Sequence, residues 1–277
     1  MSNPDPRVQR LIASQLQRVL IVDPAAPSAR LLGDLLKELG AKYLHVVATE
    51  RSALEACQAI VPQMIFTELH GVQLDGLSFV RALRRSGFQC RTAPITVVTA
   101  DATAQTITAS RDAGVHEFLR KPFTVKDLTR RVEAVTVKTR PWVEAVQYIG
   151  PDRRRFNSGD YQGMRKRKSD NRPPSHADRI GQALKILRSA LDAVDSDPTQ
   201  ALRSMLAQVA ELQKVAVELS DMKLAEAIAS LHRMLRSSAV SGRLNRAELE
   251  AGASGLWSFK PPEAPKAAAK AVETTMI

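Results

Sequence analysis

Met64-Ile-Phe-Thr-Glu68-Leu-His-Gly-Val-Gln-Leu-Asp75-Gly76 is the stretch that decides the fold. A short apolar run at residues 64–67 ends in the carboxylate of Glu68, and a turn-rich segment then leads to Asp75-Gly76, where a helical pattern begins. In an α/β domain such a run is a buried parallel strand, and parallel sheets carry their functional groups at the C-terminal ends of their strands. Glu68 is therefore the first candidate for a functional residue.

The same alternation of strand and helix continues on both sides of this stretch. Apolar runs predict strands at residues 18–23, 43–48, 64–67, 95–99 and 117–120. Helical spacing of apolar residues predicts helices at residues 28–39, 51–60, 77–85, 104–113 and 125–137. Five such units predict an α/β fold, a doubly wound five-stranded parallel sheet with helices on both faces.

Composition narrows the class of protein. A hydrophobic content of 44% over 277 residues is ordinary for a soluble protein. No apolar run approaches the ~20 residues that span a bilayer, and the N-terminus lacks a signal-peptide core, so we expect a cytoplasmic protein. Cys57 and Cys90 lack metal-binding or redox spacing, so we expect reduced thiols. The net charge of +11 favours an anionic partner.

The composition also changes along the chain and predicts five parts. Residues 1–17 are an N-terminal extension with a short helical pattern, and residues 18–138 are the α/β domain. Residues 139–175, rich in Pro, Gly and charge, have no sustained apolar period and are predicted to be an arginine-rich linker or an ordering segment, not a core element. Residues 176–259 show apolar stripes at helical spacing, which predict a small helical module that packs on itself or forms a homodimer. Residues 260–277, rich in Ala, Lys and Pro, are predicted to be a disordered tail.

Polar side chains end four of the five predicted strands. Asp23 ends the first, Glu68 follows the third, Thr99 ends the fourth and Lys121-Pro122 follows the fifth. Because the C-terminal ends of parallel strands meet at one edge of the sheet, we expect two acids, a hydroxyl and an ammonium in one crevice. The sequence contains no nucleophile–base pair, metal cluster or glycine-rich phosphate loop, so we do not expect an enzyme.

These motifs resemble the receiver domain of bacterial two-component response regulators, the CheY-like fold. The resemblance rests on Val19-Leu-Ile-Val-Asp23, Leu74-Asp75-Gly76, Val98-Thr99-Ala100 and Lys121-Pro122-Phe123, which lie at receiver spacings along residues 18–137. It implies strand order 2-1-3-4-5 and a role in phosphorelay signal transduction. It also implies a phosphoacceptor Asp that binds Mg²⁺ with two acids after the first strand, and a switch aromatic at Phe118.

The chain departs from that pattern at two positions. Glu68 stands where the phosphoacceptor Asp is expected, and Pro24 replaces the second acid. Mg²⁺ demands near-octahedral oxygen coordination, and Pro24 supplies no oxygen ligand from its side chain, so we do not expect bound Mg²⁺. The extra methylene of Glu68 displaces its carboxylate, and a misplacement on the order of 1 Å can cost ~10²-fold in rate.

We therefore predict a receiver that is not phosphorylated, in which Thr99 and Lys121 hold the Glu68 carboxylate in place of a phosphoryl group. Such a receiver is either locked in an active-like state or has a degenerate pocket in which Glu68 and Lys121 form a structural ion pair. The alternative is a phosphorelay response regulator with an atypical pocket.

The basic segment after the α/β domain suggests a second site. Between residues 151 and 172, eight basic residues oppose three acids, a net charge of +5. An Arg fork can bond guanine O6 and N7, an Arg plane or a Tyr can stack on the base, and an Asp can accept from guanine N1 and N2. The predicted guanine-dinucleotide site consists of Tyr148, Asp152, Arg153, Arg154, Arg155, Arg165 and Arg167.

Tyr148-Ile-Gly-Pro-Asp-Arg-Arg154, following a receiver-like domain, also resembles the arginine-rich extension of the Cle proteins. These are CheY-like effectors that bind cyclic di-GMP and act on the flagellar motor switch. The resemblance implies cyclic di-GMP as the ligand and a protein partner as the output. The alternatives are nonspecific binding of nucleic acid or an anionic membrane, and a structural interaction protein with a passive basic linker.

Overall fold

The structure is a computed structural model and describes residues 6–137, 139–153 and 174–259. The chain forms two compact units, Met1–Asp170 and Asn171–Ile277. In the described residues, no helix combines the length and apolar character that a membrane span requires.

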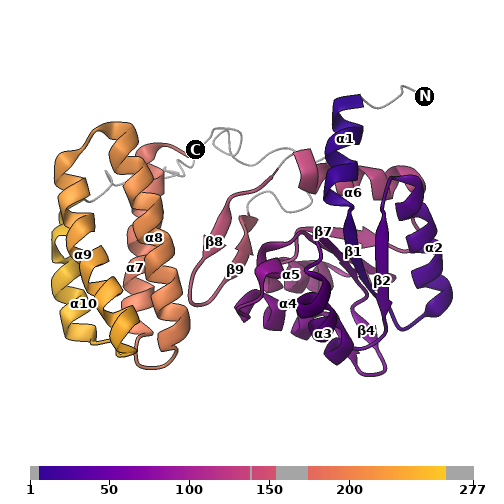
Figure 1. Cartoon of the computed structure of the whole chain (residues 1–277), viewed down its shortest axis with the longest axis horizontal. Helices are drawn as coiled ribbons and strands as arrows, with labels where there is room; N and C mark the ends of the chain where they lie inside the picture. Colours follow the sequence, from indigo (N-terminus) through magenta and orange to yellow (C-terminus); the bar gives the residue numbers. More distant parts are fainter. Residues whose placement is uncertain (1–5, 138, 154–173, 260–277) are drawn as a thin grey trace, which may run out of the picture. The chain divides into compact units, whose positions relative to one another are not determined.

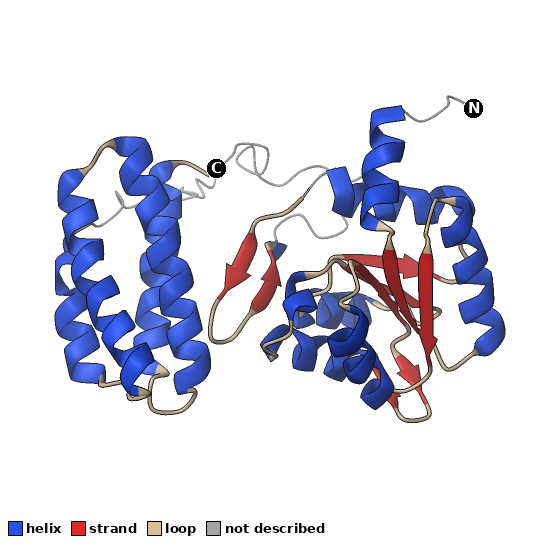
Figure 2. Cartoon of the chain, viewed as in Figure 1, coloured by secondary structure: helices blue, strands red, loops and turns tan. Residues whose placement is uncertain are grey.

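The first unit is built on a five-stranded parallel sheet (Figure 2). Its order is β2-β1-β3-β6-β7, which confirms the predicted doubly wound sheet of order 2-1-3-4-5. The residues of β3 and β6 are all buried, as expected for central strands covered on both faces. The five strands are β1 (Arg18–Val22), β2 (Tyr43–Val47), β3 (Met64–Thr67), β6 (Ile95–Thr99) and β7 (Glu117–Arg120).

Helices cover both faces of this sheet (Figure 1). One face packs against α2 (Ala26–Glu38) and α6 (Val125–Val137), and α1 (Pro6–Gln15) packs against α6. The other packs against α3 (Glu50–Ile60), α4 (Gly76–Arg85) and α5 (Ala104–Ala113).

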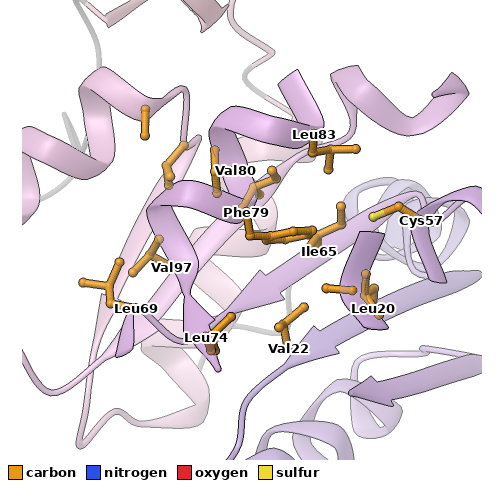
Figure 3. Close-up of a cluster of buried hydrophobic side chains, with 14 of the residues drawn as sticks. Leu20, Val22, Cys57, Ile65, Leu69, Leu74, Phe79, Val80, Leu83 and Val97 are labelled. Carbon is orange, nitrogen blue, oxygen red and sulfur yellow. The ribbon is translucent and has the colours of Figure 1, made fainter. Parts of the chain in front are cut away.

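Successive residues of β1 pack in the two hydrophobic cores on opposite faces of the sheet. Leu20 and Val22 of β1 join Phe79 of α4 in the cluster of Figure 3, whereas Val19 and Ile21 enter the opposite cluster with Leu36 of α2. Side chains of a strand alternate between faces, so a strand buried on both must be apolar throughout. This requirement explains why continuous apolar runs identified the strands.

The segment predicted as a linker without a core element is folded in its first part. β8 (Trp142–Glu144) and β9 (Ile149–Pro151) form an antiparallel hairpin, and the side chains of Tyr148 and Ile149 are buried. The hairpin belongs to the first unit and packs against α4. The two hairpin strands contain three residues each, which is too short to show a strand period, and their burial depends on contacts with distant parts of the chain.

A fully buried arginine anchors this part of the domain. Arg84, near the end of α4, donates hydrogen bonds to the carbonyl of Gly114 from Nε at 3.1 Å and from Nη2 at 3.0 Å. Its Nη1 donates to the carbonyl of Ala93 at 3.0 Å and to that of Arg91. Burial lowers the pKa of Arg84 to about 9. These carbonyls satisfy a charge that would otherwise be costly to bury.

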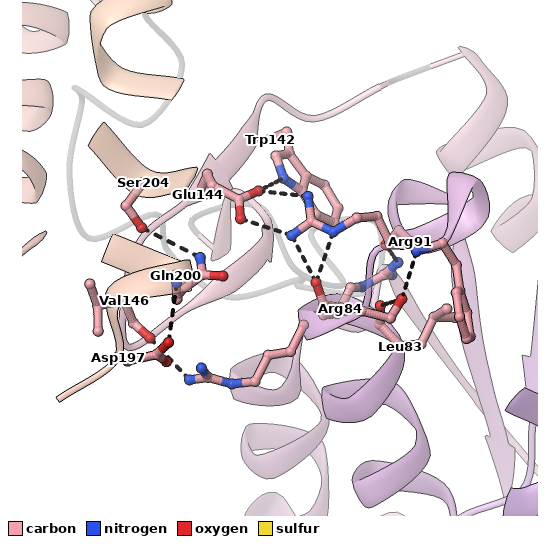
Figure 4. A network of polar contacts seen from close by, with 12 residues as sticks. Leu83, Arg84, Arg91, Trp142, Glu144, Val146, Asp197, Gln200 and Ser204 are labelled. Atoms are coloured by element: carbon pink, nitrogen blue, oxygen red, sulfur yellow. Dashed lines mark hydrogen bonds and ion pairs between the residues drawn. The ribbon is translucent and has the colours of Figure 1, made fainter. Parts of the chain in front are cut away.

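Arg91 connects this anchor to the hairpin (Figure 4). Its guanidinium donates to both carboxylate oxygens of Glu144, at 3.0 and 2.8 Å, and also to the carbonyl of Arg84. Trp142 Nε1 donates to Glu144 at 2.9 Å, and the Arg84 guanidinium lies 5.2 Å from the Trp142 ring centroid. A bidentate, largely buried pair of this kind fixes geometry as well as charge.

The second unit is a bundle of helices in which α7 packs on α8, α8 on α9 and α9 on α10. Each of the four begins at a polar N-cap residue whose side chain accepts a backbone N–H: Ser175, Asp197, Asp221 and Asn245. The elements are α7 (His176–Asp192), α8 (Pro198–Leu219), α9 (Met222–Ser241), α10 (Arg246–Ala253) and the 3-10 helix η4 (Ser254–Ser258).

We predict that Glu144→Ala lowers the unfolding free energy of the first unit by about 3 kcal/mol, because it leaves the largely buried Arg91 charge without its carboxylate. Urea denaturation followed by Trp142 fluorescence, in a Trp257→Phe background, measures this loss. The control Glu55→Ala breaks an exposed ion pair with Arg51 and should cost less than about 0.5 kcal/mol. Equal effects of the two substitutions would contradict a structural role for the Arg91–Glu144 pair.

Candidate functional site

Three strand ends supply the charged groups of the site. Asp23 follows β1, Glu68 follows β3 and Lys121 follows β7. The Lys121 Nζ lies 2.7 Å from Glu68 Oε2 and 2.9 Å from Asp23 Oδ2. The structure therefore brings the two acids and the ammonium together, with the ammonium bridging the carboxylates.

The remaining carboxylate oxygens are held by local donors. Asp23 Oδ1 accepts from the backbone N–H of Ala25 at 2.8 Å, and Oδ2 also accepts from Ser28 Oγ at 2.8 Å. Glu68 Oε1 accepts from the backbone N–H of Leu69 at 2.7 Å. Each oxygen of both carboxylates thus receives at least one hydrogen bond.

Burial makes these contacts stronger than those of an exposed ion pair. The side chains of Asp23, Glu68 and Lys121 are 5%, 14% and 21% exposed. Burial alone would lower the pKa of Lys121, but the hydrogen bonds and negative charges of Glu68 and Asp23 outweigh it and raise that pKa. Lys121 is therefore held in its protonated form.

The loop after Glu68 is fixed by the start of α4. Asp75 caps this helix by accepting from the N–H groups of Leu77 and Ser78, and the Gly76 N–H donates to the Leu69 carbonyl at 2.8 Å. A Cβ atom at Gly76 would lie 2.1 Å from the Glu68 carbonyl oxygen, so only glycine fits at this position. The Asp75-Gly76 motif thereby sets where the backbone of Glu68 lies.

Thr99 and Phe118 occupy the same region in different ways. Thr99 is buried at the end of β6, and its hydroxyl accepts from the Asp101 N–H at 3.3 Å rather than bonding to Glu68. Phe118 is 3% exposed and packs in the core cluster beneath α3, α4 and α5. The Lys121–Pro122 peptide bond is cis.

The donor set does not fit a bound Mg²⁺. The ring of Pro24 lies where the resemblance expects a second acid, and a Cβ atom on Gly71 of β4 (His70–Gly71) would approach its Cγ to 2.4 Å. A lysine ammonium, not an oxygen ligand, lies between the two carboxylates that are present. Across the described ranges, no three His, Cys, Asp or Glu side chains gather as a metal site would require.

The predicted nucleotide residues are only partly within the described residues. Tyr148 is buried, and its hydroxyl donates to the Pro151 carbonyl at 2.5 Å; burial raises its pKa to about 12. The Arg153 guanidinium lies 4.4 Å from the Tyr148 ring centroid and 3.0 Å from Asp112. Asp152 donates its backbone N–H to the Pro141 carbonyl at 2.8 Å. Arg154, Arg155, Arg165 and Arg167 lie outside the described residues.

Sequence reasoning missed Ser28 and Leu69 as donors to the site. Ser28 lies in the first turn of α2, five residues after Asp23, and a serine near the start of a helix is a common hydrogen-bond donor. Leu69 donates its backbone N–H, which every residue except proline has, so its residue type could not predict this contact.

We predict that Lys121→Met destabilises the first unit by about 3 kcal/mol near neutral pH, because two largely buried carboxylates lose their counter-charge. The raised pKa means that the Lys121 contribution is complete below the usual lysine value of about 10.5 and is lost as the pH rises through the raised value. The stability difference between the native chain and Lys121→Met should therefore stay constant from about pH 7 to about pH 9 and shrink above about pH 10.5.

Urea denaturation across this pH range measures the difference. Lys37→Met is the matched control, since it removes an exposed pair with Asp34 and should cost less than about 1 kcal/mol. A Lys121→Met loss no larger than that of the control would contradict the bridging role.

Comparisons with known proteins find matches to the first unit of the chain. Residues 19–133 match the family described as the response regulator receiver domain. A probable chemotaxis protein CheY of Rhizobium etli is 25% identical over 118 residues, covering 43% of this chain and 91% of that protein. The transcriptional regulatory protein PdtaR of Mycobacterium tuberculosis is 27% identical over 124 residues, covering 45% of this chain and 58% of the relative.

The solved structures that match also cover less than half of this chain. The chemotaxis response regulator CheY4 of Vibrio cholerae is 22% identical, with a TM-score of 0.40, covering 43% of this chain and 98% of that chain. A putative response regulator from Chloroflexus aurantiacus is 24% identical, with a TM-score of 0.41, covering 44% and 98%. The family match places a response regulator receiver domain, a signal-transduction module, at residues 19–133 of the chain.

Proposed function

We propose that this chain is a signalling adaptor whose receiver domain works without phosphoryl transfer. The observation that carries the proposal is the Lys121 ammonium, which bridges Glu68 at 2.7 Å and Asp23 at 2.9 Å. Of the two alternatives that the sequence left open for the pocket, this arrangement supports the structural ion pair between Glu68 and Lys121.

Phosphorylation needs a carboxylate oxygen that is free to attack and a cation to neutralise the incoming group. Both Glu68 oxygens already accept hydrogen bonds, one from Lys121 and one from Leu69. Pro24 contributes no side-chain oxygen, so the donor set for a divalent cation is incomplete. An attacking atom that is displaced on the order of 1 Å can lose ~10²-fold in rate. All three effects disfavour phosphorylation of Glu68.

We predict that incubation with acetyl phosphate and Mg²⁺ leaves the intact mass of the chain unchanged. The double variant Pro24→Asp/Glu68→Asp restores the missing carboxylate and the length of the acceptor, and serves as the positive control. A stable acyl phosphate on the native chain, lost in Glu68→Gln, would overturn the proposal.

The input of such an adaptor is a ligand that binds outside the carboxylate site. We propose cyclic di-GMP, bound by the arginine-rich segment that begins at Arg153. The supporting observation is the Arg153 guanidinium stacked over the Tyr148 ring at 4.4 Å, because an Arg plane held on an aromatic ring presents its other face for stacking on a base. The output is a protein partner, for which the flagellar motor switch is the candidate that the resemblance to Cle proteins implies.

Calorimetry with cyclic di-GMP and cyclic di-AMP tests the ligand. We predict saturable binding of the guanine dinucleotide, weaker binding of the adenine analogue by at least about tenfold, and loss of affinity in Arg153→Ala/Arg154→Ala. The matched control Arg51→Ala/Arg81→Ala removes two charges from α3 and α4 and should bind as the native chain does.

Equal affinity for both dinucleotides, with a steep decrease as salt rises, would instead indicate nonspecific polyanion binding. Absence of binding would favour a passive basic linker, and the helical module would then be the partner-binding part. These outcomes leave the phosphorylation test unaffected.

A further inference from the structure

β2 and β7 are the two edge strands of the sheet, and they differ in how exposed their residues are. Three of the four residues of β7 are buried, whereas Tyr43, His45 and Val46 of β2 are exposed. In the described residues, β2 pairs only with β1, so its outer side has no neighbouring strand. Tyr43 and Val46 are 71% and 50% exposed, so apolar side chains lie in solvent beside an edge whose backbone groups can pair with another chain.

A groove runs beside this edge. α2 and β2 lie side by side (Figure 1), and residues from both line a cavity of about 620 Å³. Its apolar lining consists of Ala26, Ala29, Gly33, Leu44 and Val46. A volume of this size accommodates several side chains of a bound chain.

The charged groups around the groove are mostly basic. Arg30 and Lys37 lie on α2, and Lys42 directly precedes β2. Asp34 is the one acid of the lining, and it is paired with Lys37 at 3.2 Å. No ion pair or hydrogen bond engages the side chains of Arg30 or Lys42 within the described part of the chain. The groove therefore presents positive charge beside apolar surface.

We propose that this groove binds an extended acidic segment of a partner protein, which adds to β2 as a sixth strand. An edge strand offers the backbone N–H and C=O groups of alternate residues to such a segment, and adjacent pockets select its side chains. A segment with apolar residues at alternate positions directs those side chains towards α2 and into the apolar groove. Carboxylates at its other positions give the segment a net negative charge, which the positive charge of Arg30 and Lys42 attracts. A second copy of this chain is disfavoured, because symmetric pairing of β2 strands brings the same cations together.

The probe is a fluorescein-labelled peptide of alternating Glu and Val, added to the full chain. Anisotropy measures affinity, and amide NMR shifts locate binding. We expect saturable binding with the largest shifts at Leu44 and Val46. The same peptide N-methylated at alternate residues should not bind, because it cannot form strand hydrogen bonds.

Arg30→Glu/Lys42→Glu should weaken binding of the peptide by at least about tenfold. Arg81→Glu/Lys126→Glu makes the same charge change on exposed positions of α4 and α6, and should leave the affinity unchanged. Equal effects of the two double variants, shifts located elsewhere, or no binding would overturn the proposal. Equally tight competition by an oligothymidylate would also overturn it and would identify the groove as a general polyanion site.

Discussion

The Lys121 ammonium between the Asp23 and Glu68 carboxylates is the contact on which the rest of the site depends. It joins the ends of β1, β3 and β7, and it satisfies two acids that are largely removed from water. Removing one partner from a buried ionic cluster is strongly destabilising, because the remaining charges keep their desolvation cost. The same contacts occupy the Glu68 oxygens that a phosphoryl transfer would need. One set of contacts therefore both stabilises the domain and closes the site.

A second polar cluster lies at the other end of the sheet. The Arg84 guanidinium contacts Ala93 and His116, which lie just before β6 and β7, whereas the carboxylate site follows the strands. The hairpin that carries Tyr148 is held by this second cluster through Arg91 and Glu144. A ligand bound near Tyr148 is therefore at the end of the sheet opposite to the carboxylate site, and its signal would have to act through the hairpin and α4 rather than by touching Glu68.

The sequence predicted the sheet and the meeting of Asp23, Glu68 and Lys121, because continuous apolar runs and strand ends follow from burial on both faces of a parallel sheet. It did not predict the hairpin, because the Arg91–Glu144 pair joins residues far apart in the chain and the hairpin strands contain only three residues each. Thr99 was expected to hold Glu68, but its hydroxyl bonds to its own loop at Asp101. A side-chain rotamer of this kind is set by packing and has no signature in residue type.

The most direct test of the central claim is a ¹⁵Nζ-detected NMR spectrum of the lysine ammonium groups, recorded with and without millimolar Mg²⁺. The bridged geometry predicts a slowly exchanging Lys121 signal, assigned by its loss in Lys121→Met, that Mg²⁺ does not shift. An exchange-broadened Lys121 signal, or a saturable shift on addition of Mg²⁺, would show an open site that accepts a cation. Either result would contradict the account of a closed carboxylate site.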